Sequence, residues 1–437
     1  MSGVIAGPVR NPVAEAALTP SCLHECPGCG QFQILQALAP GQVARCVRCG
    51  IVLRRAMSDP LRRGLALYLT SLVLLAILCG SALIDVNTFG MARSATVFSG
   101  PLGFSQNGLW PLSVVVGFMT LLAPLLRMVL MAYALTLLTL GRTRPHLAAV
   151  LRWAERLRPW AMIEVFLLGV FVAYTELPGL IHVEVGAGLY ALIVLMLVLV
   201  ASEMFVDRLA IWEALDRPER PAIRPASFRP GVLACECCAL VSQPQEVDGH
   251  AMCPRCGARL ERRKPDSINR TWALVLTAVM LYVPANTLPV LAFDELGSGS
   301  PHTIMGGARE LLDAGMWPLA ALVFLASIGV PCLKLAGLVL LLVTTQRRSA
   351  WQLRERTRLY GIVRAIGRWS MIDIFMESVL IGLVQFGSVV TITAGTGAVA
   401  FCTVVILTMF AAESFDPRIM WDAAASRVAI PGLTSNS

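Results

Sequence analysis

Eight apolar stretches, each long enough to cross a bilayer as a helix, alternate with polar segments along this chain of 437 residues. The pattern predicts helices at about 65–84, 110–138, 160–177, 187–206, 271–292, 316–343, 370–391 and 396–414. Longer segments rich in Gly, Ser and Thr, at 85–109 and 293–315, follow the first and fifth stretches and suit short external strands or turns. The predicted fold class is therefore mainly α, a polytopic membrane protein.

Composition agrees with this class, because 56% of the residues are hydrophobic and only 15% are charged, unlike an average soluble domain. A polar segment of about 64 residues precedes the first apolar stretch, with no basic start followed by a short apolar run. A cleavable signal peptide is therefore not expected.

The basic residues predict the orientation. Of 36 Lys and Arg residues, 32 lie in the N-terminal tail, the 139–159 and 344–369 loops, the 207–270 segment and the C-terminal tail. The positive-inside rule then predicts that both termini and both cysteine-rich segments are cytoplasmic. Topology and anionic lipid headgroups explain the net charge of +8. No nucleic-acid partner is expected, because the basic residues follow the span ends instead of forming one patch.

The chain contains an internal duplication. GLWPLSVVVGFMTLLAPLLRM (108–128) aligns without gaps on GMWPLAALVFLASIGVPCLKL (315–335), and RPWAMIEVF (158–166) aligns on GRWSMIDIF (367–375). Each copy has an even number of spans, so the two copies are expected to be parallel repeats. The predicted organisation is an N-terminal tail (1–20), metal ribbon 1 (21–58), four-helix module 1 (59–210), a linker (211–230), metal ribbon 2 (231–264), four-helix module 2 (265–420) and a C-terminal tail (421–437).

Two clusters of paired cysteines precede the two modules. The pairs are separated by 16 residues in the first cluster and by 14 in the second; the eight cysteines are Cys26, Cys29, Cys46, Cys49, Cys235, Cys238, Cys253 and Cys256. Two CxxC turns can bring four thiolates to one tetrahedral metal ion. We predict two structural zinc sites, although four thiolates also suit iron. Disulfides are not expected in a reducing cytoplasm.

Lys334 lies in the middle of an apolar run, SIGVPCLKLAGLVL (327–340). A charge at this depth costs roughly 2.5–3.5 kcal/mol on insertion scales, so it normally faces a partner or water. At ~1.5 Å per residue, Lys334 is roughly 15 Å and Glu377 roughly 12 Å from the cytoplasmic side. Asp373 lies one helical turn before Glu377, and Ser327 lies on the lysine's own helix face.

In the first copy, Arg127 stands in the place of Lys334 and Glu164 in the place of Asp373. One interpretation is that the charges form buried ion pairs that lock the helices. The other is a polar pathway or titratable switch. Lysine suits a switch because it loses its proton readily on burial, whereas arginine does not. The second copy is therefore the better candidate for transport chemistry, and the first is more structural.

Four strings of the second copy, together with the paired CxxC ribbons, resemble the paraquat-inducible protein A family of bacterial inner-membrane proteins. The strings are MLYVPANTLPVL (280–291), FLASIGVPCLK (324–334), GRWSMIDIF (367–375) and LTMFAAESFDPRIMWD (407–422). The resemblance implies an inner-membrane partner of periplasmic MCE-domain proteins that move phospholipids between the two membranes of a Gram-negative cell. It also implies a functional polar cluster at Ser327, Lys334, Ser370 and Thr408, with Asp373 in the same WSMID motif. Glu377 rests on the depth argument alone.

Two hypotheses about function follow. The first is a lipid-transport subunit that works with an MCE-domain protein, with proton coupling through Lys334 as an open alternative to a fixed charge. The second is a membrane-anchored redox or metal-stress sensor in which the cysteine ribbons are the active element. An enzyme is not expected, because the sequence contains no H-E-x-x-H or G-x-S-x-G pattern. A phosphate-binding loop is also missing from the sequence, so no nucleotide partner is expected.

Overall fold

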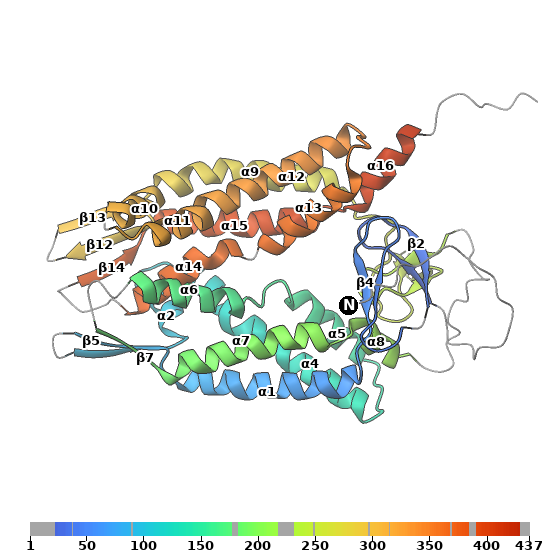
Figure 1. The fold of residues 1–437 in the computed structure, drawn as a ribbon, viewed down its shortest axis with the longest axis horizontal. Helices are drawn as coiled ribbons and strands as arrows, with labels where there is room; N and C mark the ends of the chain where they lie inside the picture. Colours follow the sequence, from blue (N-terminus) through green and yellow to red (C-terminus); the bar gives the residue numbers. More distant parts are fainter. Residues whose placement is uncertain are drawn as a thin grey trace, which may run out of the picture.

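The computed structural model describes residues 22–36, 38–88, 91–176, 182–216, 231–247, 250–295, 298–313, 315–367, 369–383 and 390–428. The predicted terminal tails fall largely outside these ranges, as does most of the linker. Within them the fold is mainly helical and consists of two modules with the same order of elements (Figure 1).

The first module begins with a ribbon of four short strands and continues through helices that run the length of the molecule. Its elements are β1 (Cys22–Glu25), β2 (Phe32–Leu35), β3 (Val43–Arg45), β4 (Val52–Arg55), α1 (Pro60–Gly80), β5 (Ile84–Thr88), β6 (Met91–Ala95), α2 (Ser99–Gln106), α3 (Trp110–Gly117), α4 (Ala123–Thr139), α5 (Leu147–Leu157), α6 (Ile163–Glu176), β7 (His182–Val185), α7 (Ala187–Phe205) and α8 (Arg208–Ala214).

The second module repeats this order. Its elements are β8 (Leu233–Ala234), β9 (Val241–Ser242), β10 (Gln245–Val247), β11 (His250–Met252), α9 (Ser267–Thr287), β12 (Leu291–Glu295), β13 (Ser298–His302), α10 (Ile304–Asp313), α11 (Trp317–Phe324), α12 (Val330–Gln346), α13 (Leu353–Ile366), α14 (Ile372–Leu383), β14 (Val390–Ala394), α15 (Thr396–Ser414) and α16 (Arg418–Val428). The predicted duplication is thus a structural one.

A single π-helical turn interrupts the second long helix of each module, at Phe118–Leu122 and at Leu325–Gly329. Pro124 and Pro331 lie two residues after the ends of these turns. Proline lacks the N–H that an α-helix needs, so the backbone just before it relaxes to a wider turn. The wider turn occurs beside Arg127 in one copy and beside Lys334 in the other.

Six described helices are long and apolar enough to cross a membrane: Pro60–Gly80, Trp110–Thr139, Ala187–Phe205, Ser267–Thr287, Ala320–Gln346 and Thr396–Ser414. The remaining two apolar stretches form shorter helices than predicted. α6 has 14 residues and α14 has 12, which at ~1.5 Å per residue is about 21 and 18 Å, less than the ~30 Å hydrocarbon core. In α14, every residue from Ile372 to Ile381 is buried, so protein surrounds this short helix.

The two short helices pack against each other and join the modules (Figure 1). The ring centroids of Phe166 and Phe375 lie 5.9 Å apart, edge to face. A Cβ placed on Gly169 would lie 2.8 Å from the Cβ of Phe375, and one on Gly100 of α2 would lie 1.8 Å from the hydroxyl of Ser378. Glycine is required at both positions because the backbones approach so closely.

Each end of the helix bundle carries small β structures (Figure 1). At one end, the predicted external segments form antiparallel sheets of order β6-β5-β7 and β13-β12-β14. Their third strands, β7 and β14, follow the short helices and lie outside the segments where strands were predicted. At the other end are the cysteine ribbons, together with α5, α8, α13 and α16. The basic loops and the ribbons therefore share one end, as the charge pattern predicts.

Candidate functional site

The eight predicted cysteines form two four-sulfur clusters. In ribbon 1, the cysteines lie on the turns between the paired strands β1–β2 and β3–β4. In ribbon 2, Cys235 and Cys238 lie between β8 and β9, and Cys253 and Cys256 lie on the turn that follows β11. All eight are buried, and the four sulfurs of each cluster lie within 4.8 Å of one another. Among the described residues, these two are the groups of ligand atoms that could hold a metal ion.

The sulfur geometry fits a metal ion and does not fit disulfides. The Sγ atoms of Cys26 and Cys49 are 3.4 Å apart, and those of Cys29 and Cys46 are 3.5 Å apart. The second cluster has the same spacings. A tetrahedral ion with metal–sulfur bonds of about 2.3 Å would separate its ligands by about 3.8 Å, whereas a disulfide requires about 2.05 Å. Both clusters can therefore bind a metal, with the four thiolates as ligands.

Lys334 lies inside the second module, with a side chain only 2% exposed. Its ammonium donates a hydrogen bond to the hydroxyl of Thr408 on α15, with an Nζ–Oγ1 distance of 2.8 Å. Thr408 uses its own proton for the carbonyl of Val405, so its oxygen is available as an acceptor. The backbone of Gly367 also lies against the lysine, because a Cβ there would be 3.0 Å from Nζ.

The carboxylates predicted at the depth of Lys334 lie on α14 and are buried as well. Asp373 lies near Ser327 of the π-helical turn, and Glu377 lies near Cys402 of α15. The hydrogen bond that Lys334 donates thus goes to the neutral hydroxyl of Thr408. Depth counting gives the height of a residue in the membrane but not the direction in which its side chain points.

Several polar atoms of this cluster have no hydrogen-bond partner among the described residues. They include the hydroxyl oxygen of Ser370 and one carboxylate oxygen, Oδ2, of Asp373. A buried polar group without a partner costs about 1–3 kcal/mol. Ser327, Lys334, Ser370, Asp373, Glu377 and Thr408 are all buried in one part of the second module. Together they form an interior polar cluster in an otherwise apolar region.

In the first module, Arg127 is neutralised by a carboxylate that the sequence did not indicate. Glu203, near the end of α7, pairs with Arg127 through one oxygen and with Arg158 through the other. Glu164, the expected counterpart of Asp373, lines a cavity together with Arg127, Arg158 and Glu203. At the repeat offset of 209, residue 412 corresponds to Glu203 and is an alanine, so the repeat gave no signal for this pair.

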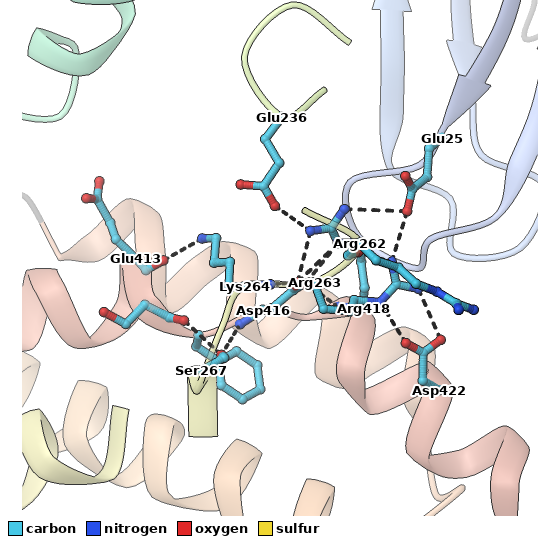
Figure 2. Close-up of polar contacts among 12 residues, drawn as sticks. Glu25, Glu236, Arg262, Arg263, Lys264, Ser267, Glu413, Asp416, Arg418 and Asp422 are labelled. Carbon is cyan, nitrogen blue, oxygen red and sulfur yellow. Dashed lines mark hydrogen bonds and ion pairs between the residues drawn. The ribbon is translucent and has the colours of Figure 1, made fainter. Parts of the chain in front are cut away.

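Arg418 at the start of α16 lies at the centre of an ion cluster between the ribbons and the second module (Figure 2). Its Nε lies 3.0 Å from Asp416 Oδ1 and its Nη1 lies 3.4 Å from Glu25 Oε1 of ribbon 1. Nη2 pairs with Glu236 of ribbon 2. Burial alone would raise the pKa of Asp416, but hydrogen bonding to Arg418 and its charge lower that pKa below the usual value. Burial would lower the pKa of Arg418, but its hydrogen bond with Asp416 and the surrounding carboxylate charges raise it.

Both ribbons also contact the first module. Arg54 of ribbon 1 pairs with Asp207 at 3.1 Å and with Glu213 of α8 at 2.8 Å. Arg255 of ribbon 2 pairs with Asp216, just beyond α8. Each ribbon is therefore joined by ion pairs to the ends of both helical modules. The motif D-P-R (416–418) was visible in the sequence, but its partners lie up to 393 residues away.

These features define a multi-pass membrane protein of two tandem modules, each preceded by a four-cysteine metal ribbon. The family model described as Paraquat-inducible protein A matches residues 61–216 and 268–425. The chain belongs to the paraquat-inducible protein A family.

Curated relatives agree with this assignment. The chain is 32% identical over 404 residues to "Intermembrane transport protein PqiA" of Escherichia coli (strain K12), covering 91% of this chain and 95% of that protein. It is 31% identical to "Lipophilic envelope-spanning tunnel protein A" of the same strain, covering 92% of each. A "Probable intermembrane transport protein" of Haemophilus influenzae is 24% identical, covering 91% of this chain and 94% of that protein. No solved structure matches.

Proposed function

We propose that this protein is a lipid-transport subunit of a Gram-negative inner membrane and that the polar cluster of its second module carries the transport step. The names of its relatives, an intermembrane transport protein and an envelope-spanning tunnel protein, support transport across the envelope. The termini and ribbons face the cytoplasm, and the two three-stranded sheets face the periplasm. The partner there is an MCE-domain protein that passes phospholipid to or from the outer membrane.

The observation that carries this proposal is the environment of Lys334. A cation at this depth is costly, and a structural role would favour a direct ion pair of the kind that Arg127 forms with Glu203. Lys334 instead donates to the hydroxyl of Thr408, which supplies a dipole but no opposite charge. The side chain can therefore exchange that bond for a phosphate oxygen of a lipid or lose its proton during transport.

The two modules then have different tasks. Arg127 cannot release its proton and is held by Glu203, which makes the first module the more rigid one. In the second module, Asp373 and Glu377 lie on the short buried helix α14, next to the lysine-bearing region, and are the groups that would exchange protons with Lys334. The ribbons hold zinc and join the cytoplasmic ends of the modules; iron in the same four thiolates is the alternative.

The test is complementation of envelope integrity in cells that lack this protein, with variants expressed at equal levels in the membrane. We expect Lys334→Ala to abolish function, with insertion unchanged, and Lys334→Arg to separate a fixed charge from a titrating one. Full activity of the Lys334→Arg variant would rule out proton coupling through this residue. The competing sensor hypothesis predicts the opposite ranking: Cys26→Ser fails although it folds, and Lys334→Ala works normally.

A further inference from the structure

The second cysteine turn of ribbon 1 contacts two helices of the second module. Arg354 of α13 donates a hydrogen bond to the carbonyl oxygen of Arg48 at 3.1 Å. The guanidinium of Arg48 lies over the ring of Trp421 of α16, 4.5 Å from its centroid. Arg48 lies between the predicted metal ligands Cys46 and Cys49. The metal-binding turn itself therefore makes these contacts, through both its backbone and a side chain.

The first cysteine turn of ribbon 1 also lies against α13. A Cβ placed on Gly28, inside this turn, would be 3.1 Å from Cγ2 of Thr357. Thr357 is buried and accepts a hydrogen bond from the indole Nε1 of Trp421 at 3.0 Å. Both cysteine turns of ribbon 1 thus meet α13 and α16 in one continuous contact, with Thr357 and Trp421 in its interior.

Helix α13 extends from this contact to Lys334. Near its start, Arg356 donates a hydrogen bond from Nη2 to the hydroxyl of Thr345 on α12, at 3.2 Å. Just beyond its end, a Cβ placed on Gly367 would lie 3.0 Å from Nζ of Lys334. The intervals 356–367 and 334–345 have the same length, so α13 lies antiparallel along α12 for about 16 Å. One helix therefore connects the cysteine turns of ribbon 1 to the lysine.

Helix α13 is also joined to α15, which carries the hydrogen-bond acceptor of Lys334. The hydroxyl of Tyr360 lies 3.1 and 3.3 Å from the carbonyl oxygens of Ala412 and Phe415. Ala412 lies one helical turn beyond Thr408. Because α13 contacts both α12 and α15, its position affects both helices that form the hydrogen bond between Lys334 and Thr408.

The cysteine turns of ribbon 2 contact the first module instead. Arg255, which aligns with Arg48 at the repeat offset of the cysteine clusters, pairs with Asp216 just beyond α8. A Cβ placed on Gly257 would lie 3.3 Å from Nη1 of Arg152 on α5. The cysteine turns of the two ribbons thus rest on opposite modules.

A weaker contact joins the cysteine turns of ribbon 2 to α16. Glu236 pairs with Arg418 there, but the carboxylate is 51% exposed, and exposed ion pairs contribute little to stability. Arg263, which pairs with Asp422 of α16, lies beyond the last cysteine and just before α9. The shape of the ribbon 2 turns therefore has little influence on α13.

The shape of a cysteine turn depends on its metal, because binding to structural thiolate sites is coupled to local folding. We propose that the metal-loaded form of ribbon 1 positions α13 and, through Gly367, the surroundings of Lys334. Loss of metal from ribbon 1 then loosens the polar cluster of the second module, whereas loss from ribbon 2 does not. The coupling to α13 stands on these contacts alone, and its consequence for lipid movement rests on the function proposed above.

The test is hydrogen–deuterium exchange of the purified full chain in detergent. It compares Cys49→Ser with Cys256→Ser, which removes the corresponding ligand of ribbon 2. Elemental analysis confirms that each variant keeps the ion of its other ribbon. We expect Cys49→Ser to raise exchange in residues 353–366 roughly tenfold, the effect of losing one hydrogen bond and one cation–π contact. Cys256→Ser should leave this helix unchanged and raise exchange in residues 208–214 instead.

A variant outside the metal site tests the contact itself. Trp421→Leu should keep both ions and raise exchange in residues 353–366 as Cys49→Ser does, and the double variant should exchange little faster than either. Trp153→Leu, at a tryptophan 55% exposed on α5, is the matched control and should leave this helix unchanged. If Cys49→Ser does not accumulate, a chelator removes the ribbon 1 ion from the Cys256→Ser protein, and the same rise is expected.

Equal exchange of residues 353–366 after loss of either ion, or no rise after loss of the ribbon 1 ion, would overturn the proposal. At equal expression, Cys49→Ser should also lower the rate of lipid movement more than Cys256→Ser does, and equal rates would refute the link from α13 to Lys334. A wild-type rate with Lys334→Ala would instead contradict the proposed function and leave the exchange result unaffected, so the two failures are distinguishable.

Discussion

Replacing Arg418 with methionine tests whether the ribbons are held to the helical modules by buried charge. Methionine keeps most of the side-chain volume and removes the guanidinium. The side chains of Arg418, Asp416 and Glu25 are 5%, 1% and 7% exposed, whereas Glu236 is 51% exposed. Breaking a buried pair costs about 3–5 kcal/mol, and an exposed one rarely costs more than about 1 kcal/mol.

The expected cost lies near the lower limit of that range. Glu25 keeps its contact with Arg263 at 3.2 Å, and Asp416 keeps the backbone N–H of Lys264 at 3.2 Å. We therefore expect about 3 kcal/mol, which corresponds to a rise on the order of 100-fold in local opening. Hydrogen–deuterium exchange of the purified, metal-loaded protein measures this opening in residues 22–55 and 231–256.

The pH dependence follows from the lowered pKa of Asp416. Because the pKa of Asp416 is lower in the folded protein than its ordinary value of 3.8, this carboxylate stabilises the folded protein at pH values above 3.8. The stabilisation is lost as the pH falls through the pKa of the folded state. The part of the cost of Arg418→Met that comes from Asp416 should therefore be constant between about pH 6 and 8. The control is Arg358→Met, which removes an exposed pair with Glu355 and should change exchange by less than about 1 kcal/mol. Equal exchange in the two variants would refute the reasoning.

Three further changes test the metal sites and the polar cluster. Cys46→Ser should lower the metal content from two ions per chain to one, measured by elemental analysis, and an unchanged content would contradict the four-thiolate site. Gly367→Ala places a Cβ 3.0 Å from the ammonium of Lys334 and should lower the Tm. The control is Gly361→Ala, which has open space around it and should stabilise helix α13 by about 0.5–1 kcal/mol. Equal Tm values for the two variants would contradict the packing of Gly367 against Lys334. Thr408→Val removes the acceptor of Lys334 and should cost about 1–3 kcal/mol in thermal unfolding, and a Tm equal to that of the wild type would argue against this hydrogen bond.

Local patterns in the sequence predicted the parts of the fold that local chemistry determines. The CxxC spacing predicted the four-sulfur clusters. The repeat predicted the order of elements in each module. Hydropathy alone overestimated the length of the third apolar helix of each module, because a stretch such as 370–391 is apolar whether it faces lipid or protein.

The contacts between distant segments could not be predicted in this way. Glu203 binds Arg127, and Arg418 binds Glu25, only because the folded chain brings them together. Depth counting placed Lys334 and Glu377 at a similar height, but the hydrogen bond of the lysine depends on the rotation of α12 toward α15. Sequence spacing within one helix contains no information about the rotation of its neighbours.

The central claim is that Lys334 and its surroundings carry lipid through the second module. The most direct measurement is the rate at which labelled phospholipid moves between the inner and outer membranes of cells that contain only this member of the family. With Lys334→Ala, the rate should fall to that of cells without the protein. Leu333→Ala, at the adjacent residue with a side chain 68% exposed, should leave the rate unchanged. A wild-type rate with Lys334→Ala at equal expression would contradict the account.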